Sequence, residues 1–333
     1  MSGNSFGQLL KITTFGESHG EALGVIIDGM PAGISISLGD LKNELKRRAP
    51  GQHRVHTSRK EDDVPEILSG IFENKTLGNP ITVIVRNVNQ KSEDYESLKN
   101  DYRPGHADRT TMMKYGHRDH RGGGRASGRE TLARVIGGYF AGLIIPQISF
   151  YAYIEEVAHF KLSSTPENHS VQRGEINIPD KELSDKVITY LSECKLKGES
   201  AGGVVVLSVL HTPAGLGEPV FDKLKADLAK AMLSIPACIG FGISKAFENA
   251  TMPGSLMSSD AKNFGGIEGG ISNGEEIVLR LAFKAPSTLG EKAKAGRHDP
   301  CILPRVVPVV EAMAKIVIAD HYLRQSAYDS FRS

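Results

Sequence analysis

The segment from Arg118 to Ile144 reads RDHRGGGRASGRETLARVIGGYFAGLI and joins a glycine-rich loop to a run with helical apolar spacing. Three consecutive glycines, Gly122–Gly124, let the backbone approach a ligand closely. Ser127 to Thr131 lead into a helix expected over Glu130–Ile144, whose N-terminus would favour an anion. The segment matches neither the GxxxxGK[ST] phosphate loop nor a GxGxxG fingerprint after a strand. It therefore supports neither an ordinary nucleoside triphosphatase nor a Rossmann dehydrogenase.

Strand and helix patterns flank that segment on both sides. Apolar β-rich runs predict strands at Gln8–Thr14, Ala22–Asp28, Pro80–Arg86, Ile148–Ile154, Gly203–Leu210 and Glu276–Phe283. Helical spacing predicts further helices, the second of them capped by Asp180, at Leu38–Arg48, Lys181–Cys194, Phe221–Leu233 and Val307–Leu323. Because the strands do not alternate strictly with helices, an α+β layered fold is favoured over a doubly wound parallel sheet. No linker or repeat divides the chain, so residues 1–333 are interpreted as one domain.

Composition places the chain among ordinary globular proteins, with 24% charged and 40% hydrophobic residues in 333. The three cysteines, Cys194, Cys238 and Cys301, have neither disulfide-framework nor metal-site spacing, which fits a reducing compartment and predicts no metal. The N-terminal sequence has no signal-peptide pattern, and no apolar run approaches the ~18 residues that a membrane span needs. A cytoplasmic protein without a membrane partner is expected.

Positive charge is concentrated in two segments of a nearly neutral chain, whose net charge is +1. Lys46–Lys60 carries +6 and Arg103–Arg134 carries +5, so the remainder carries −10. A solvated face explains many such runs, but these arginines lie among glycine and proline turns, and arginine suits bidentate phosphate or carboxylate binding. A small polyanionic ligand is the leading interpretation. RNA binding through arginine and glycine is the alternative, and it is weakened by 6% aromatic residues and no Trp.

Two histidines next to glycine are candidates for proton transfer. His19 lies in GESHG after the first predicted strand, and His106 lies in RPGHAD, where Asp108 is close enough in sequence to orient its ring. A later cluster, KAPST at 284–288 and GRHDPC at 296–301, places Arg297, His298 and Asp299 side by side. These three residue types supply an anion contact, a proton donor and a base, although a structural turn at Asp299-Pro300 explains that aspartate equally well.

Taken together, these motifs resemble the chorismate synthase family from about Gly7 to Leu323. The matching segments, in the family's order, are GESHG, RRAPGQ with TSRKEDD and ILSGIF, RPGHAD, RDHRGGGRASGRET, GGISNGEEIVLRLAFK and GRHDPCILPRVVPVVEAMAKIVIADHYL. The resemblance implies a β-α-β sandwich, in which antiparallel sheets flank a helical layer, usually assembled as a homotetramer. It also implies reduced FMN as cofactor, with NADPH as a candidate reductant.

The implied reaction is the 1,4-anti elimination of phosphate and a C6 hydrogen from 5-enolpyruvylshikimate 3-phosphate, giving chorismate in the shikimate pathway of aromatic amino acid biosynthesis. The resemblance makes His19 the acid for the departing phosphate and His106 the group that protonates or polarises the reduced flavin. It makes Asp299 the partner of flavin N5 that helps to take the C6 proton. The substrate has one phosphate and two carboxylates, which agrees with an arginine-rich site.

The resemblance also implies contacts for the ligands. Substrate contacts fall on Arg48, Arg54, Arg103 and Arg129, of which Arg48 and Arg54 also match positions proposed for a reduced pyridine nucleotide. Flavin contacts fall on Arg125, Ala126, Ser127, Pro236, Ala237, Gly269, Lys284, Ala285, Pro286, Ser287, Thr288 and Arg297. The sequence departs from the family pattern at Ala49, which replaces an arginine, and at His120, which replaces a common tyrosine. Pro286 is displaced by one residue, and the loop before Arg297 is short.

Overall fold

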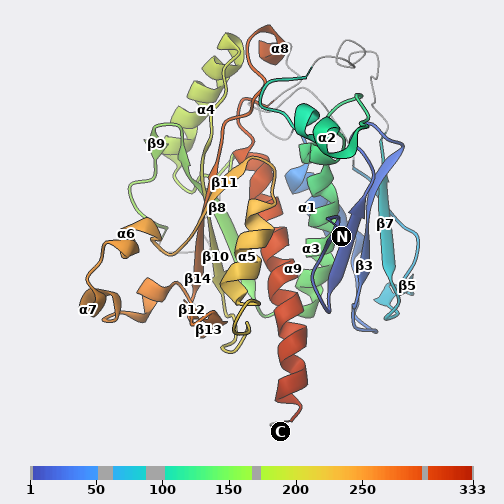
Figure 1. Cartoon of the computed structure of the whole chain (residues 1–333), viewed down its shortest axis with the longest axis vertical. Coiled ribbons are helices and arrows are strands. Elements are labelled where there is room, and N and C mark those ends of the chain that lie inside the picture. The colour runs from blue at the N-terminus through green and yellow to red at the C-terminus, as the bar shows by residue number, and fades with distance from the viewer. Residues whose placement is uncertain (1–2, 52–62, 88–101, 167–173, 295–298, 332–333) are drawn as a thin grey trace.

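The computed structural model describes residues 3–51, 63–87, 102–166, 174–294 and 299–331. Within these residues, two antiparallel five-stranded sheets enclose a layer of helices (Figure 1). Most of the buried apolar side chains form one continuous cluster that includes both sheets and the helices between them. The predicted α+β fold with antiparallel sheets flanking a helical layer is therefore confirmed. None of the described helices is both long and apolar enough to cross a membrane.

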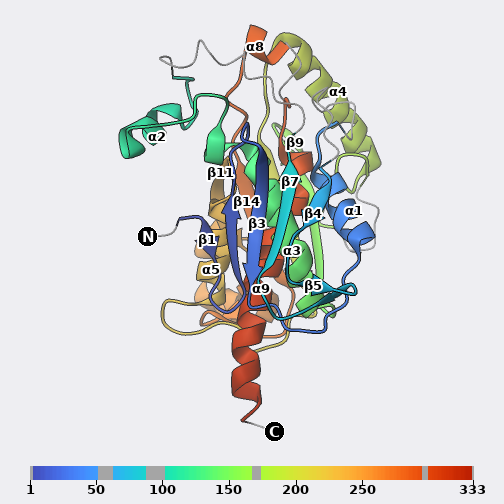
Figure 2. The same cartoon turned by 90° about the vertical axis from the view of Figure 1, so that its right-hand side faces the viewer.

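The first sheet contains the N-terminal strands and faces the viewer in Figure 2. Its strand order is β1 (Ser5–Phe6), β2 (Lys11–Phe15), β3 (Ala22–Asp28), β7 (Ile81–Arg86) and β4 (Pro65–Ile67). Alternate residues of β7 are buried, as expected for a strand with one face on the core. Val25 of β3 lies opposite Val83 of β7, so both apolar side chains face the helices.

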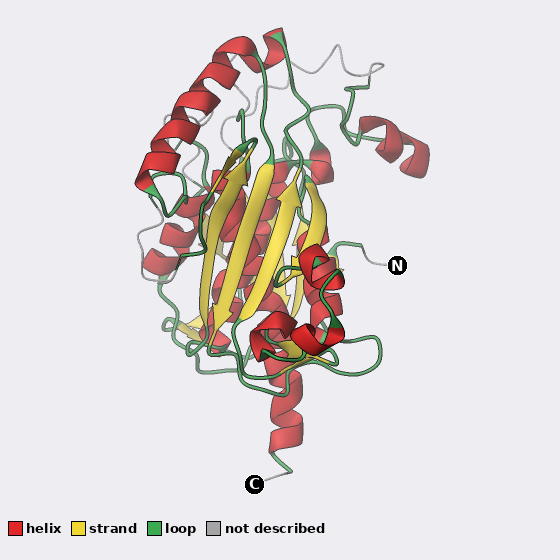
Figure 3. Cartoon of the chain, turned by 90° about the vertical axis from the view of Figure 1, so that its left-hand side faces the viewer, coloured by secondary structure: helices red, strands yellow, loops and turns green. Residues whose placement is uncertain are grey.

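The second sheet closes the other side of the helical layer, and its outer surface is visible in Figure 3. Its strand order is β11 (Cys238–Ile243), β14 (Ile277–Phe283), β10 (Gly203–Leu210), β8 (Ser149–Val157) and β9 (Phe160–Lys161). Val205, Leu207 and Val209 of the central strand face the helices. Both neighbours of this strand are antiparallel, so hydrogen bonds fix its register on both sides.

The helical layer is built on α9 (Leu303–Asp329), which packs against α3 (Thr131–Ile144), α5 (Leu224–Leu233) and α1 (Leu38–Arg48). Pro308 lies inside α9 and has no N–H to donate to the carbonyl of Pro304. Asn177 supplies the missing donor, because its Nδ2 lies 3.1 Å from that carbonyl oxygen. The helix can therefore begin at Leu303, four residues before the predicted start.

The remaining elements lie around this sandwich. The longest is α4 (Lys181–Lys197), whose predicted cap is confirmed by the 2.8 Å bond from Leu183 N to Asp180 Oδ1. The short elements are β5 (Ile71–Phe72), β6 (Lys75–Thr76), α2 (Asp108–Tyr115), α6 (Phe247–Ala250), α7 (Gly254–Met257), β12 (Ile267–Glu268), β13 (Ile271–Ser272) and α8 (Glu291–Lys294). Three 3-10 turns are η2 (Gly124–Ala126), η3 (Gly128–Glu130) and η4 (Ala261–Phe264).

A buried polar cluster ties the C-terminal half of α9 to other parts of the chain. Asp320 Oδ1 accepts three backbone hydrogen bonds, from Gln8, Leu9 and Leu10, which holds the turn before β2. Nearby, His321 Nε2 lies 2.9 Å from Asp227 Oδ2, which joins α9 to α5.

This Asp227–His321 contact predicts a pH-dependent contribution to stability. The hydrogen bond from His321, with the charges of His321, Arg324 and Lys230, lowers the pKa of Asp227 despite its burial. A carboxyl group with a lowered folded-state pKa stabilises the fold above its unfolded value, about 3.9, and loses that contribution as the pH falls through the folded value. We expect Asp227→Asn to lower the free energy of unfolding by about 1.5–3 kcal/mol at pH 7.

Urea unfolding at neutral and acidic pH measures this contribution. The difference between wild type and Asp227→Asn should shrink as the pH falls below about 4. The control is Asp185→Asn, which removes an exposed carboxylate from α4 and should leave stability unchanged. A difference that persists undiminished at low pH would show that the carboxylate charge is not its source.

Candidate active site

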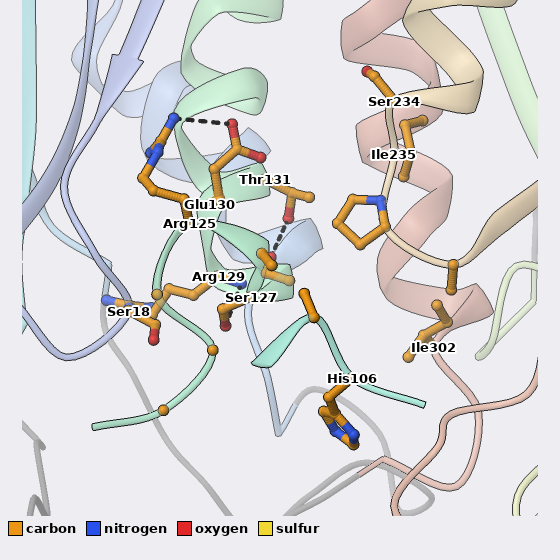
Figure 4. Close-up of a pocket in the computed structure, with 18 of the residues that line it drawn as sticks. Ser18, His106, Arg125, Ser127, Arg129, Glu130, Thr131, Ser234, Ile235 and Ile302 are labelled. Carbon is orange, nitrogen blue, oxygen red and sulfur yellow. Dashed lines mark hydrogen bonds and ion pairs between the residues drawn. The ribbon is translucent and has the colours of Figure 1, made fainter. Parts of the chain in front are cut away.

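A cavity of about 1800 Å³ lies between the first sheet, the α5–β11 connection and the N-terminal half of α9. Binding pockets for one small ligand usually measure about 300–1,000 Å³, so this cavity has room for more than one. Figure 4 shows Ser127, Arg129 and Glu130 at the start of α3, with Ser234, Ile235 and Ile302 across from them. The imidazole ring of His106 is drawn near the bottom of the same view.

Most of the residues predicted for the site line this one cavity. They are His19, Arg48, Arg103, His106, Arg125, Ala126, Ser127, Arg129, Pro236, Ala237, Lys284, Ala285, Pro286, Ser287, Thr288 and Asp299. Gly269 does not, because it lies in the turn between β12 and β13. Figure 1 shows these two strands at the opposite end of the sandwich from α2. Arg54, Arg297 and His298 lie outside the described residues.

His19 follows the end of β2 and is buried in the cavity wall. Its Nδ1 lies 3.0 Å from Ser18 Oγ, so the neighbouring serine fixes the orientation of the imidazole ring. The ring also packs against Gly122 of the glycine-rich loop. A Cβ atom at Gly122 would lie 2.3 Å from His19 Nδ1, and the φ of Gly122 is +100°. Only glycine meets both requirements at this position.

We therefore expect Gly122→Ala to displace the ring of His19. The sequence predicts that His19 transfers a proton, and a displacement of about 1 Å in a reacting group can cost on the order of 10²-fold in rate, so turnover should fall by about that factor. The control is Gly116→Ala, because Gly116 also has a positive φ, of +69°, but a Cβ atom there meets nothing within 4 Å. Steady-state kinetics of the two purified variants measure the difference. Equal losses in both would show that backbone strain, not contact with His19, is responsible.

His106 lies in a loop that docks on the Lys284–Thr288 segment. Its Nδ1 lies 3.0 Å from the carbonyl oxygen of Pro104, and because a carbonyl only accepts, this nitrogen carries the hydrogen. Nε2 therefore remains for a ligand. The loop is held by Ser287, whose Oγ donates to the carbonyl of Gly105 over 3.3 Å. The segment is held in turn by Ser200, whose Oγ donates to the carbonyl of Pro286, the displaced proline.

The interpretation of Asp108 as an orienting group for His106 is wrong. The buried carboxylate of Asp108 instead accepts two hydrogen bonds from the guanidinium group of Arg103, at 2.8 and 2.9 Å. Burial raises the pKa of Asp108, but the hydrogen bonds from Arg103 and the charges of Arg103 and Arg118 outweigh it, so the pKa is lowered. Arg103 also donates to the carbonyl of Gly122, which links it to the loop beneath His19.

Arg125 is held by its own chain at the edge of the cavity. Its guanidinium group donates to backbone oxygens of Gly16 and Thr14, and it lies 3.9 Å from the carboxylate of Glu130 (Figure 4). Glu130 is buried and is also paired with Arg134 at 2.8 Å. This network joins β2 to the start of α3, so the side chain of Arg125 has a structural role in addition to any ligand contact.

Arg48 and Arg129 share one carboxylate. Asp63 Oδ1 accepts from Arg129 Nη1 at 2.9 Å, and Asp63 Oδ2 lies 3.4 Å from Arg48 Nη1. Arg48 also donates to the carbonyl of Gly128 and to Thr131 Oγ1. These contacts connect the end of α1 to the start of α3. Both guanidinium groups are therefore fixed in the cavity wall.

Asp299 lies just before α9 and is paired with Arg305 in the first turn of that helix, with 2.5 Å between Oδ2 and Nη1. Arg305 Nε also donates to the backbone carbonyl of Arg48. The late aspartate and the end of α1 are thus joined through one arginine.

The lining is strongly basic. Nine basic residues line the cavity against five acidic ones, Glu17, Asp108, Asp119, Glu130 and Asp299, which leaves a net +4. A cavity of one sign of charge with low-dielectric walls concentrates ligands of the opposite sign. An apolar strip on the opposite wall consists of Ile235, Ile302, Val306, Val309 and Met313. The cavity can therefore hold a polyanion next to a flat apolar ring system.

Comparison with known sequences agrees with this site. The sequence model of the chorismate synthase family matches residues 10–323. The chain belongs to the chorismate synthase family. Of the residues that line the cavity, all except Gly3, Asn4, Ser5 and Phe6 lie within this match.

Individual chorismate synthases are similar along nearly their whole length. The chorismate synthase of Christiangramia forsetii is 46% identical over 98% of this chain and 99% of its own. Those of Synechocystis sp. and Methanosarcina mazei are 44% and 46% identical, over 98% and 97% of this chain and the same shares of theirs. A crystal structure of a chorismate synthase superposes with a TM-score of 0.76 and 31% identity, covering 96% of this chain and 93% of that one.

The function of the chain follows from this membership. It is a lyase of the shikimate pathway that converts 5-enolpyruvylshikimate 3-phosphate to chorismate with loss of phosphate. Its substrate is a small molecule with three acidic groups, which is the kind of ligand that the charge of the cavity favours.

Two residues of the site, Asp63 and Arg305, were not predicted from the sequence. Asp63 is the only one of the acids in KEDD that lies within the described residues, and Arg305 lies six positions after Asp299. In each case the available signal was a charge opposite to that of a predicted site residue. Sequence spacing gave no means of pairing Asp63 with Arg129, since the two residues lie 66 positions apart.

Proposed function

We propose that His19, His106 and Asp299 act on substrate and reduced FMN bound together in the 1800 Å³ cavity. The observation that carries this proposal is their convergence, since residues 19, 106 and 299 come from three distant parts of the chain and line the same space. The cavity volume supports two ligands rather than one.

The residues present fit a flavin. Ala126, Ser127, Pro236 and Ala237 provide small side chains that let a ligand approach closely, and Ala237 has a φ of +67° in its turn. The apolar strip that includes Ile302 suits an isoalloxazine ring, and the basic residues suit its phosphate. When bound, reduced FMN supplies an electron-rich ring that assists the breaking of the carbon–oxygen bond. The protein supplies orientation and charge.

His19 holds the proton that the departing phosphate oxygen receives. Its ring is fixed by Ser18 on one side and by Gly122 on the other, so the imidazole has one orientation in the wall of the cavity. An imidazolium group also balances part of the charge that develops on the phosphate as the bond breaks.

His106 stabilises the reduced flavin. Its Nδ1–H is committed to the carbonyl of Pro104, so a proton bound at Nε2 makes the ring cationic toward the cavity. Docking of its loop on Ser287 keeps this nitrogen beside the segment whose other residues match flavin contacts.

Asp299 helps to take the proton lost from C6 of the substrate. Its carboxylate is oriented by Arg305, which fixes Oδ2. Arg103, Arg129 and Arg48 hold the anionic groups of the substrate, and their own contacts with Asp108 and Asp63 reduce the ordering that binding requires.

The homotetramer and the cytoplasmic location belong to this proposal. Gly269 matches a flavin contact but does not line the cavity of its own chain, so the proposal requires a neighbouring copy to bring it to the flavin. Sedimentation of the pure protein as a monomer would contradict that assembly.

NADPH is the proposed reductant of FMN. Loss of NADPH absorbance in a mixture of FMN and the pure protein tests whether an external reductase is needed.

An anaerobic turnover assay tests the proposed chemistry. The protein is mixed with substrate and with either reduced or oxidised FMN, and phosphate and chorismate are measured together. We expect equal amounts of both products with reduced FMN and neither with oxidised FMN. Equal turnover with oxidised FMN, or release of phosphate without chorismate, refutes the cofactor assignment.

A further inference from the structure

We infer that Asp63 is a positioning residue that aligns Arg48 and Arg129 for the substrate. The inference rests on the proposed substrate contacts of these two arginines. Asp63 does not itself line the cavity among the described residues, whereas both arginines do. Its effect on the substrate is therefore exerted through them.

The geometry is that of a shared clamp. One oxygen of Asp63 contacts Arg129 at 2.9 Å, and the other contacts Arg48 at 3.4 Å. The side chains of Asp63, Arg129 and Arg48 are 1%, 7% and 2% exposed, so solvent screens these contacts very little. A single carboxylate thus fixes two guanidinium groups that come from η3 and from the end of α1.

The charges explain why the clamp is needed. Two buried guanidinium groups repel one another, and a shared carboxylate offsets one of the two positive charges while it sets their separation. Asp63, Arg48 and Arg129 together carry a net charge of +1, and both guanidinium planes are already oriented. Preorganised groups lose less freedom when a ligand binds, so the clamp increases affinity for an anion.

The backbone fixes the position of Asp63. This residue has a φ of +43°, in the left-handed region that aspartate tolerates better than most residues. Two residues later Pro65 begins β4, which pairs with Val85 of β7. The carboxylate is therefore located by the edge of the first sheet rather than by the arginines alone.

Asp63→Asn tests the clamp, because asparagine keeps the shape and tolerates this backbone conformation but removes the charge. Substrate affinity is measured by calorimetry with oxidised FMN present, and KM and kcat are then measured with reduced FMN. We expect Kd and KM to rise by about 10–100-fold, the loss that corresponds to a hydrogen bond to a charged group, and kcat to change less than about threefold.

Glu66→Gln is the matched control. It neutralises a carboxylate three residues further on, whose partner Arg86 is exposed and which does not line the cavity. Its Kd should equal that of the wild type. A folded Asp63→Asn protein with Kd within twofold of the wild type overturns the inference, even if its stability is reduced.

A second variant covers the case in which Asp63→Asn does not fold. Asp63→Glu keeps the charge and moves the carboxylate by one methylene group, so it should fold and still bind substrate at least several-fold more weakly. Unchanged affinity in this variant overturns the inference.

Arg129→Gln separates failure of this inference from failure of the proposed function. Weakened binding by Arg129→Gln with normal binding by the Asp63 variants rejects the clamp alone. Normal binding by Arg129→Gln also rejects the proposed substrate contact.

Discussion

Replacement of His19 by alanine is expected to lower kcat by about 10²–10⁴-fold, the usual contribution of a general acid. The loss should be in the chemical step, because the arginines that hold the substrate are untouched. The side chain lies between Ser18 and Gly122, and neither contact joins distant elements of the sandwich core. The variant should therefore fold, and its thermal stability should fall only slightly.

Single-turnover measurements of phosphate release under anaerobic conditions test this expectation. The control is His117→Ala, which removes an exposed histidine that does not line the cavity, and it should retain wild-type turnover. Phosphate release by His19→Ala at the wild-type rate would remove His19 from the role of acid.

Replacement of His106 by alanine is expected to slow turnover by a similar factor of about 10²–10⁴. Here the cause differs, because His106 is proposed to act on the flavin rather than on the phosphate. Loss of the cationic ring should weaken binding of reduced FMN more than binding of oxidised FMN. The docked loop should persist, since Ser287 contacts the backbone of Gly105 and not the imidazole ring.

Anaerobic titration with FMN in both oxidation states measures that preference. The same His117→Ala variant is the control, and it should bind both forms as the wild type does. An equal loss of affinity for oxidised and reduced FMN in His106→Ala would show that His106 has no specific effect on the reduced cofactor.

Much of the fold could be predicted because its strands and helices have strong local patterns. Ala22–Asp28, Gly203–Leu210 and Leu38–Arg48 have the same bounds in the structure as in the sequence prediction. Each has an apolar periodicity that matches its element, and each contributes buried apolar side chains to the central cluster.

Elements without that periodicity were missed for identifiable reasons. Strand β11 contains Gly240 and Gly242, which have no side chains and so weaken its alternating pattern. The strand forms because it pairs with β14, a contact that its own sequence does not indicate. Helix α2 has only Asp108 buried, so it has no apolar stripe to detect. The helix predicted from Phe221 begins at Leu224, because the preceding residues form a loop that ends where Leu224 N bonds to Gly270 O.

The candidate site could be predicted as residue types but not as contacts. Arginines, glycine-flanked histidines and a late aspartate are visible in the sequence because the chemistry of anions and protons requires those groups. Asp63, the partner of Arg129, is brought to it by packing of the sheets and helices, which local spacing does not encode. The orientation of Arg125 toward β2 is known only once β2 and η2 are placed together.

The central claim is that substrate and flavin occupy one cavity lined by His19, His106 and Asp299. A crystal structure of the protein grown anaerobically with FMN and 5-enolpyruvylshikimate 3-phosphate tests it most directly. We expect density for both ligands inside this cavity, with the substrate phosphate in contact with His19. Density for either ligand at a separate surface, with the cavity filled by water, would contradict the claim.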